Sequence, residues 1–137
     1  MNSMQRNALR ASFVLSLIGL VVSIYLTVYH YTNFTLACPN HGIINCENVL
    51  SSPYATLFGL PIAIYGIIFF LIELLFLRIN KNDFLLIYNS IGIGFVFYFI
   101  YIEKVVGSIC IYCTSVHIIV ATLFILSIYY SVKNSKE

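Results

Sequence analysis

The sequence predicts an all-α integral membrane protein, a four-transmembrane-helix bundle with an extracytoplasmic loop between its first two spans. Hydrophobic residues make up 61% of the 137 residues and charged residues only 9%, whereas soluble domains carry about 25% charged residues. Four stretches approach the roughly 20 apolar residues that a spanning helix needs. Lysine and arginine also gather on one side of these stretches, as they do in multi-span membrane proteins.

The predicted spans cover residues 8–31, 58–77, 84–101 and 109–132. The first is too long for a signal peptide, and no small-residue cleavage site follows it. Neither a linker-like segment nor an internal repeat divides the chain, so residues 1–137 are expected to form a single domain. An even number of spans puts both termini on the same side of the membrane.

Positive charges set the predicted orientation. Six of the seven Lys and Arg residues flank the termini or the connection between the second and third spans, and only Lys104 lies on the other side. The positive-inside rule therefore makes the side of the termini cytoplasmic. The chain is short and ends without an endoplasmic-reticulum retention signal, so we expect a prokaryotic plasma membrane. A net charge of +2 without a basic patch gives no reason to expect a nucleic-acid partner.

Two segments then face outward, the loop at residues 32–57 and the turn at residues 104–108. The loop is rich in residues that form turns and helix caps. We expect a short helix around residues 46–51 that lies over the outer ends of the spans as a lid. Val49, Leu50 and Tyr54 can pack the loop onto the bundle.

All four cysteines lie in or beside these outward segments, Cys38 and Cys46 in the loop, Cys110 and Cys113 at the start of the fourth span. Disulfides form and persist outside the cytoplasm. A bridge between Cys110 and Cys113 would close one helical turn and constrain almost nothing, whereas this spacing is typical of exchange through mixed disulfides. A non-enzymatic membrane protein with structural disulfides is the alternative.

The start of the fourth span has the features of a reactive thiol site. Ser108 is the expected N-cap, which puts Cys110 in the first turn, where the helix dipole stabilises a thiolate. Cys110, Cys113 and His117 follow helical spacing and share one face. An ionisable residue inside a span is a functional candidate, although His117 can also be a structural histidine bonded to a neighbouring helix. The sequence leaves open which thiol is more acidic.

Metal sites fit the sequence less well. A structural zinc site brings two close ligand pairs, whereas seven residues separate Cys38 from Cys46. Haem attachment needs a histidine directly after the second cysteine, and Thr114 stands there. We therefore expect no metal. Within the spans, Glu73 is expected to reach toward Arg78 at the membrane surface rather than to relay protons.

The sequence resembles the vitamin K epoxide reductase family over nearly its whole length. The motifs that carry the resemblance are the following: the loop pair Cys38 and Cys46, the segment Cys46-Glu47-Asn48-Val49-Leu50-Ser51-Ser52, Phe58-Gly59-Leu60-Pro61 at the start of the second span, and Cys110-Ile111-Tyr112-Cys113 opening the fourth. DsbB-type enzymes, which do a similar task, carry their Cys-x-x-Cys in the first outer loop instead.

The resemblance implies an electron relay through the four cysteines. A thioredoxin-like extracytoplasmic thiol oxidase, supplied in trans, would exchange disulfides with Cys38. Electrons would pass to Cys46 and then to Cys110. Cys113 would face a lipid-soluble quinone, ubiquinone, menaquinone or a related compound, as the electron acceptor.

The resemblance also implies residues near the quinone. Ser52 matches a loop serine near the active cysteines, while Phe58 and Gly59 match residues beside the quinone pocket. His117 stands where vertebrate relatives have a tyrosine that hydrogen-bonds the substrate, and Ala55 stands where they have an asparagine. Because alanine cannot replace that amide, we expect quinone reduction; vitamin K quinone or epoxide reduction proper is the alternative.

Overall fold

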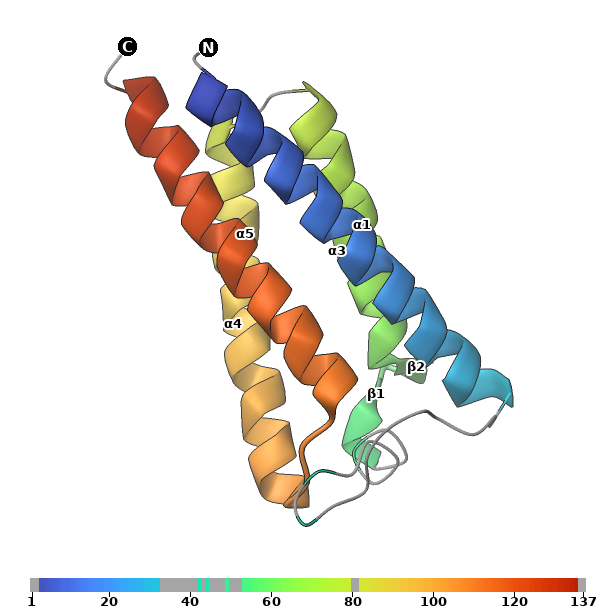
Figure 1. Ribbon diagram of the computed structural model, residues 1–137. Helices are drawn as coiled ribbons and strands as arrows, with labels where there is room; N and C mark the ends of the chain where they lie inside the picture. Colours follow the sequence, from blue (N-terminus) through green and yellow to red (C-terminus); the bar gives the residue numbers. More distant parts are fainter. Residues whose placement is uncertain are drawn as a thin grey trace.

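The computed structural model describes residues 3–32, 42, 44, 49, 53–79 and 82–135. The long helices in it are α1 (Ser3–Thr32), α3 (Ile62–Ile79), α4 (Asn82–Val106) and α5 (Ile111–Ser135). All four are long and apolar enough to cross a membrane, so the predicted four-helix membrane bundle is confirmed. We call the end of the bundle where both chain termini lie the terminal end, and the opposite end, which carries residues 53–61 and 107–110, the loop end (Figure 1).

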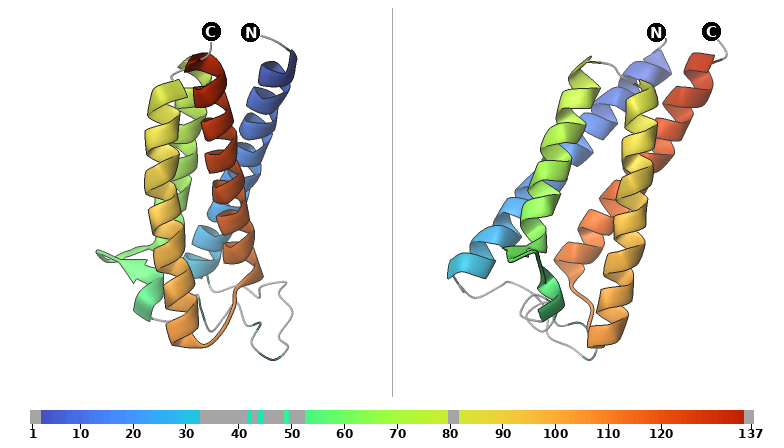
Figure 2. Two further views of the ribbon diagram at one scale, coloured as in Figure 1. Left: turned by 90° about the vertical axis from the view of Figure 1, so that its left-hand side faces the viewer. Right: turned by 180° about the vertical axis from the view of Figure 1, so that it is seen from behind.

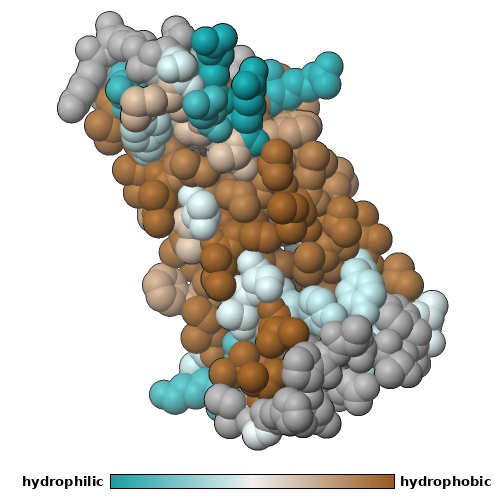
Figure 3. Space-filling view, viewed as in Figure 1, coloured by the Kyte–Doolittle hydropathy of each residue, from teal (hydrophilic) through white to brown (hydrophobic). Residues whose placement is uncertain are grey.

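The bundle consists of two antiparallel helix pairs. α1 packs chiefly against α3, and α4 packs chiefly against α5, while contacts between α1 and α5 join the pairs (Figures 1 and 2). Large apolar side chains are exposed along all four helices. On the face that Figure 3 shows, hydrophobic residues cover the middle of the bundle and hydrophilic residues gather at the terminal end. This is the surface that a protein surrounded by lipid tails requires.

Small residues allow α1 and α3 to approach closely. A Cβ atom on Gly66 would lie 2.7 Å from the Ser23 hydroxyl oxygen, and one on Gly19 would overlap the Phe70 ring. Without a hydrophobic driving force between helices in lipid, such close backbone approach is a main source of association energy. The centre of the bundle is a buried apolar cluster of Phe70, Val96, Ile119, Val120 and Leu123.

A buried polar pair joins α3 to α4 in the terminal half of the bundle. The Asn89 side-chain amide donates to the Glu73 carboxylate over 3.1 and 3.3 Å, and to the Leu85 carbonyl oxygen over 3.0 Å. Glu73 is only 1% exposed, so the expectation that it reaches toward Arg78 at the surface is wrong. A partner on α4 keeps its carboxyl group inside the bundle.

The second span begins later than predicted, at Ile62 instead of residue 58. Residues before it form a short 3-10 helix, η1 (Pro53–Ala55), and a two-stranded hairpin of β1 (Thr56–Leu57) and β2 (Leu60–Pro61). Phe58 and Gly59 make the turn with φ of 54° and 80°, a left-handed conformation that no helix continues through. The Tyr65 hydroxyl donates to the Leu57 carbonyl oxygen over 2.8 Å and ties the hairpin to α3.

The connection between α4 and α5 is tighter than predicted. α4 continues to Val106, past the expected end at residue 101, and the N–H of Gly107 bonds the Glu103 carbonyl oxygen over 2.9 Å. Gly107 has a φ of 82°, as is typical of the glycine that ends a helix. Glu103 therefore belongs to a membrane helix and not to an outer turn.

Part of the outer loop contacts the turn between α4 and α5. Ile44 forms an isolated parallel bridge with Ile109, which delays the start of α5 to Ile111 instead of residue 109. Val49 is 6% exposed and packs against Cys110, so its predicted packing on the bundle is confirmed. Val49, the one described residue within the predicted lid helix at residues 46–51, is helical; the rest of that prediction lies outside the described residues.

Candidate active site

Cys110 is the N-cap residue of α5. Its carbonyl oxygen accepts the first helical hydrogen bond, from the Thr114 N–H over 2.9 Å. Its sulfur accepts a hydrogen bond from the N–H of Cys113 over 3.4 Å. This is the position and bonding pattern of an N-cap side chain, with sulfur in place of the usual oxygen. The prediction that Ser108 caps the helix is therefore wrong, because the helix begins after the cysteine.

The surroundings of Cys110 favour its thiolate. The Cys113 thiol donates a hydrogen bond to the Cys110 sulfur, and the backbone N–H groups of Cys113 and Tyr112 also point to it. These donors lower the pKa of Cys110, against the opposing effects of burial and of the Glu103 carboxylate. Both cysteines are free thiols. Cys110 is thus the thiol of the pair that the helix terminus prepares for nucleophilic attack.

The two sulfurs have different neighbours. Cys110 is fully buried and packs against Val49 from the outer loop. Cys113, one helical turn further along α5, lines a cavity inside the bundle. Cys113 also packs against the cluster of Val49 and Cys110. Of the two cysteines, Cys113 alone lines the cavity.

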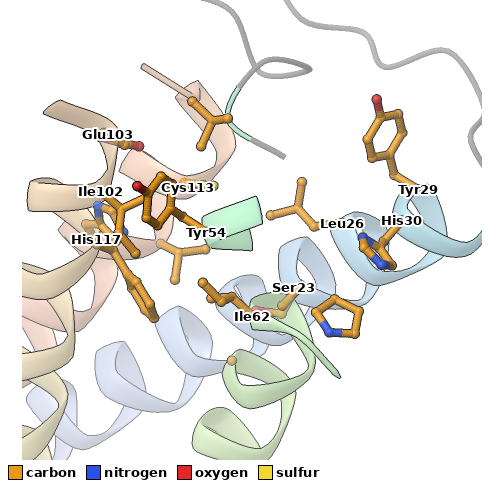
Figure 4. Close-up of a pocket in the computed structure, with 16 residues that line it drawn as sticks. Ser23, Leu26, Tyr29, His30, Tyr54, Ile62, Ile102, Glu103, Cys113 and His117 are labelled. Atoms are coloured by element: carbon orange, nitrogen blue, oxygen red, sulfur yellow. The ribbon is translucent and has the colours of Figure 1, made fainter. Parts of the chain in front are cut away.

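The cavity lies at the loop end and has a volume of about 110 Å³. All four helices contribute to its walls, together with residues of the loop and the hairpin. Glu103, Cys113, His117 and Tyr54 lie at one wall, and His30 and Tyr29 at the other (Figure 4). The remaining lining residues are mostly apolar: Ser23, Leu26, Val49, Pro61, Ile62, Ala63, Gly66, Phe99, Ile102 and Val116.

His117 is 8% exposed and presents its ring to the cavity. The ring stacks on Phe99 of α4, with centroids 6.0 Å apart and planes 17° from parallel. Among the described residues, no hydrogen-bond partner of the imidazole is found. His117 therefore retains its capacity to bond a ligand in the cavity, which the alternative of a structural histidine would have used up.

Glu103 is a cavity residue that sequence analysis missed. Its Oε1 atom is buried without a hydrogen-bond partner among the described residues. The backbone N–H of Cys110 hydrogen-bonds the carboxylate. The predicted third span ends at residue 101 and the predicted outer turn begins at residue 104, so Glu103 falls between them. The signal that would have found it is an acidic residue inside an apolar helix, two turns before the Cys-x-x-Cys motif.

The lining fits the ring of a quinone, the group that the family resemblance implies. The cavity is close in size to the engineered cavity of roughly 150 Å³ that binds benzene. Its apolar walls and few polar groups are typical of small-molecule sites. His117 and the unpartnered Glu103 oxygen can bond the polar edge of a ring, and Cys113 is the thiol beside it. An isoprenoid tail would have to remain in the lipid.

The other predicted site residues are not all brought together. Phe58 and Gly59 form the hairpin turn and are not among the residues that line the cavity. The Phe58 ring is 90% exposed, so its predicted contact with a quinone has no support in this geometry. Cys38, Cys46 and Ser52 lie outside the described residues.

The described residues contain no group of three His, Cys, Asp or Glu side chains placed to hold a metal ion. The sequence model of the vitamin K epoxide reductase family matches residues 10–128, which is most of the chain. No curated protein matches the sequence.

Proposed function

Because the chain belongs to the vitamin K epoxide reductase family, a family of membrane oxidoreductases acting on thiols and quinones, we propose that it supports disulfide bond formation. It oxidises a thioredoxin-like extracytoplasmic partner and passes the electrons through two cysteine pairs to a membrane quinone. The predicted orientation puts both termini in the cytoplasm and the loop end on the outer side of a plasma membrane.

The observation that carries this proposal is the division of contacts within one cysteine pair. Cys110 packs against Val49 of the outer loop and does not line the cavity, whereas Cys113 does line it. A relay needs one sulfur that exchanges with a protein thiol and one that meets an oxidant. A structural disulfide pair needs neither contact.

Chain connectivity supports exchange between Cys46 and Cys110. Ile44 forms a β-bridge with Ile109, and Val49 packs on Cys110. Cys46 lies between Ile44 and Val49 in the sequence. An extended chain of two residues spans at most about 7 Å, which limits how far Cys46 can be from Ile44. Cys38, the other loop cysteine, is then the one that meets the partner.

The exchange step follows from the geometry of the α5 terminus. The Cys46 thiolate attacks the sulfur of Cys110 in a Cys110–Cys113 disulfide, forming a Cys46–Cys110 bond and releasing Cys113 as a thiolate. The released Cys113 then takes up a proton and becomes the thiol that donates a hydrogen bond to the Cys110 sulfur. Cys38 then attacks Cys46, which restores the loop disulfide and returns Cys110 as a thiolate. The partner reduces that loop disulfide again in the next cycle.

The second half of the reaction takes place in the cavity. A bound quinone accepts two electrons and two protons overall. Cys110 and Cys113 supply the electrons as their disulfide forms again. The imidazole of His117 orients the ring by a hydrogen bond, and Phe99 holds the imidazole in place. The apolar walls exclude water, so that the thiols react with the lipid-soluble acceptor.

The test is a disulfide map of trapped protein. A Cys38→Ala/Cys113→Ala double variant should accumulate a Cys46–Cys110 bond after reaction with an oxidised thioredoxin-like protein, because neither resolving thiol is present. Peptide mapping by mass spectrometry without reduction detects it, and Cys46→Ala is the control. The proposed function is wrong if Cys46 and Cys110 never form a disulfide and the wild-type protein reduces no short-chain ubiquinone analogue.

A further inference from the structure

The Glu103 carboxylate contacts two different parts of the site, the start of α5 and the cavity. On one side the Cys110 N–H bonds its carboxylate, which ties it to the start of α5. On the other side its Oε1 atom is buried, without a partner among the described residues, in a residue that lines the cavity beside Cys113. A buried oxygen left without a partner costs free energy, and a catalytic role is one explanation for such a group.

The cavity contains several groups that can hold a proton. They are His30 and Tyr29 from α1, Tyr54 from η1, Glu103 from α4, and Cys113 and His117 from α5. Glu103 carries the one carboxyl group among the described lining residues. Its charge also acts on the thiols, since the Glu103 carboxylate raises the pKa of Cys110. The neighbouring charge on α4, Lys104, is exposed and does not line the cavity.

We propose that Glu103 is the proton carrier between the Cys110–Cys113 pair and the cavity. The inference rests on the proposed function, because it needs a proton-accepting oxidant in the cavity. As the Cys110–Cys113 bond forms, the S–H bond of Cys113 breaks and Glu103 Oε1 receives that proton. Glu103 then releases the proton into the cavity and is a carboxylate again.

The oxidation of the cysteine pair transfers two electrons and two protons. Two electrons leave the sulfur pair for the quinone, and two protons accompany them. One is the proton that Glu103 takes from Cys113. The other comes from water, which received the Cys110 proton when Cys110 became a thiolate. The net change is two thiols and one quinone to one disulfide and one quinol. The His117 ring remains the group that orients the acceptor.

The decisive variant is Glu103→Gln, because a glutamine oxygen still accepts the hydrogen bond of the Cys110 N–H but cannot carry a proton. Glu73→Gln is the matched control, since it makes the same change at a buried carboxyl group that does not line the cavity. Each protein is reduced and mixed with a short-chain ubiquinone analogue, and the oxidation of the thiols is followed in a single turnover across pH.

For Glu103→Gln we expect the single-turnover rate to fall by about 100-fold or more, the usual contribution of a positioned acid–base group. The limb of the pH–rate profile that reports the titration of Glu103 should be absent in this variant. Glu103→Asp should recover part of the rate, and Glu73→Gln should retain the wild-type rate. An unchanged rate in Glu103→Gln overturns the proposal. So does a lower rate that more quinone restores, because that marks a residue for binding only.

A second measurement needs no quinone. The pH dependence of Cys110 alkylation should shift to lower pH in Glu103→Gln, because the carboxylate that raises the pKa of Cys110 is gone. Glu73→Gln should show no shift, and an unshifted Glu103→Gln would mean that the carboxylate does not act on the pair. If the alkylation midpoint differs between wild type and Glu103→Gln but the wild-type protein reduces no quinone, the proposed function is wrong. The proposed proton transfer by Glu103 is then wrong as well, although the carboxylate still acts on Cys110.

Discussion

Glu73, which is fully buried, and Glu103, which has a buried Oε1 atom, lie on neighbouring helices in different halves of the bundle. Both oxygens of Glu73 accept hydrogen bonds from Asn89, and the residue does not line the cavity. Glu103 has one oxygen without a partner and lies at the cavity wall beside a thiol. The same side chain therefore joins helices in the terminal half and remains available for chemistry at the loop end.

The comparison shows why burial alone does not identify a functional acid in a membrane protein. Ionisable residues inside spans are rare and commonly functional, yet Glu73 satisfies that description and has a sufficient structural partner. What separates the two is the balance of hydrogen bonds around each oxygen. The predictions that follow test this division between a structural terminal half and a reactive loop end.

The largest effect should come from the loop end itself. Cys113→Ser should lower quinone reduction by about 10³-fold or more, because no disulfide can form with Cys110 and removal of a covalent group is rarely compensated. Steady-state absorbance of a short-chain ubiquinone analogue measures it. Ser115→Ala, which changes an exposed hydroxyl two residues away, should retain full activity. Substantial turnover in Cys113→Ser would contradict the relay.

His117→Phe should have a smaller effect, confined to the quinone. Phenylalanine can keep the stacking on Phe99 but loses the hydrogen bond to the acceptor, which is worth about 1.4 kcal/mol or tenfold in KM. Stopped-flow exchange with the reduced partner should be nearly unchanged. His30→Phe, at the opposite wall, is the comparison. Equal losses in both steps would return His117 to a structural role.

In the terminal half, a substitution should change stability and not turnover. Asn89→Leu removes the interhelical hydrogen bonds to Glu73 and should cost about 1 kcal/mol, the usual scale inside membranes. Thermal unfolding in detergent measures the loss. Ser90→Leu, at an exposed site on the same helix, controls for the added side chain. A tenfold loss of turnover in Asn89→Leu would show that the two ends are coupled.

Hydropathy and spacing predicted the bundle, because bilayer thickness fixes how long an apolar helix must be. They did not predict where each span ends, because local backbone conformation decides it. Phe58 and Gly59 turn the chain before α3, and Gly107 ends α4. The predicted third span ends at residue 101 and therefore leaves out Glu103, which belongs to α4.

The residues of the candidate site that belong to a sequence motif could be predicted, whereas the contacts that depend on tertiary packing could not. Cys110, Cys113 and His117 follow from spacing on one helix. The separate neighbours of the two sulfurs depend on the Ile44–Ile109 bridge and on Val49, contacts between distant segments that no local pattern encodes. The partner of Glu73 likewise comes from another helix.

The smallest effect is expected for the hydrogen bond between the two cysteines, measured as the pH midpoint of Cys110 alkylation. The Cys113 thiol donates to the Cys110 sulfur and lowers the pKa of Cys110. Loss of that donor in Cys113→Ala should therefore raise the pH midpoint of Cys110 alkylation. Cys113→Ser keeps a donor and should raise it less.

The measurement uses a protein with Cys38 and Cys46 replaced by serine and resolves the modified residue by mass spectrometry. Because Cys110 is fully buried, absolute alkylation rates report access, so only the midpoint of the pH dependence is compared. A rise in Cys113→Ala and a fall in Glu103→Gln would show that the thiol donor and the carboxylate act on Cys110 in opposite directions. Equal midpoints in the three proteins would mean that Cys110 owes its reactivity to the helix terminus alone, since only the backbone N–H donors are common to all of them.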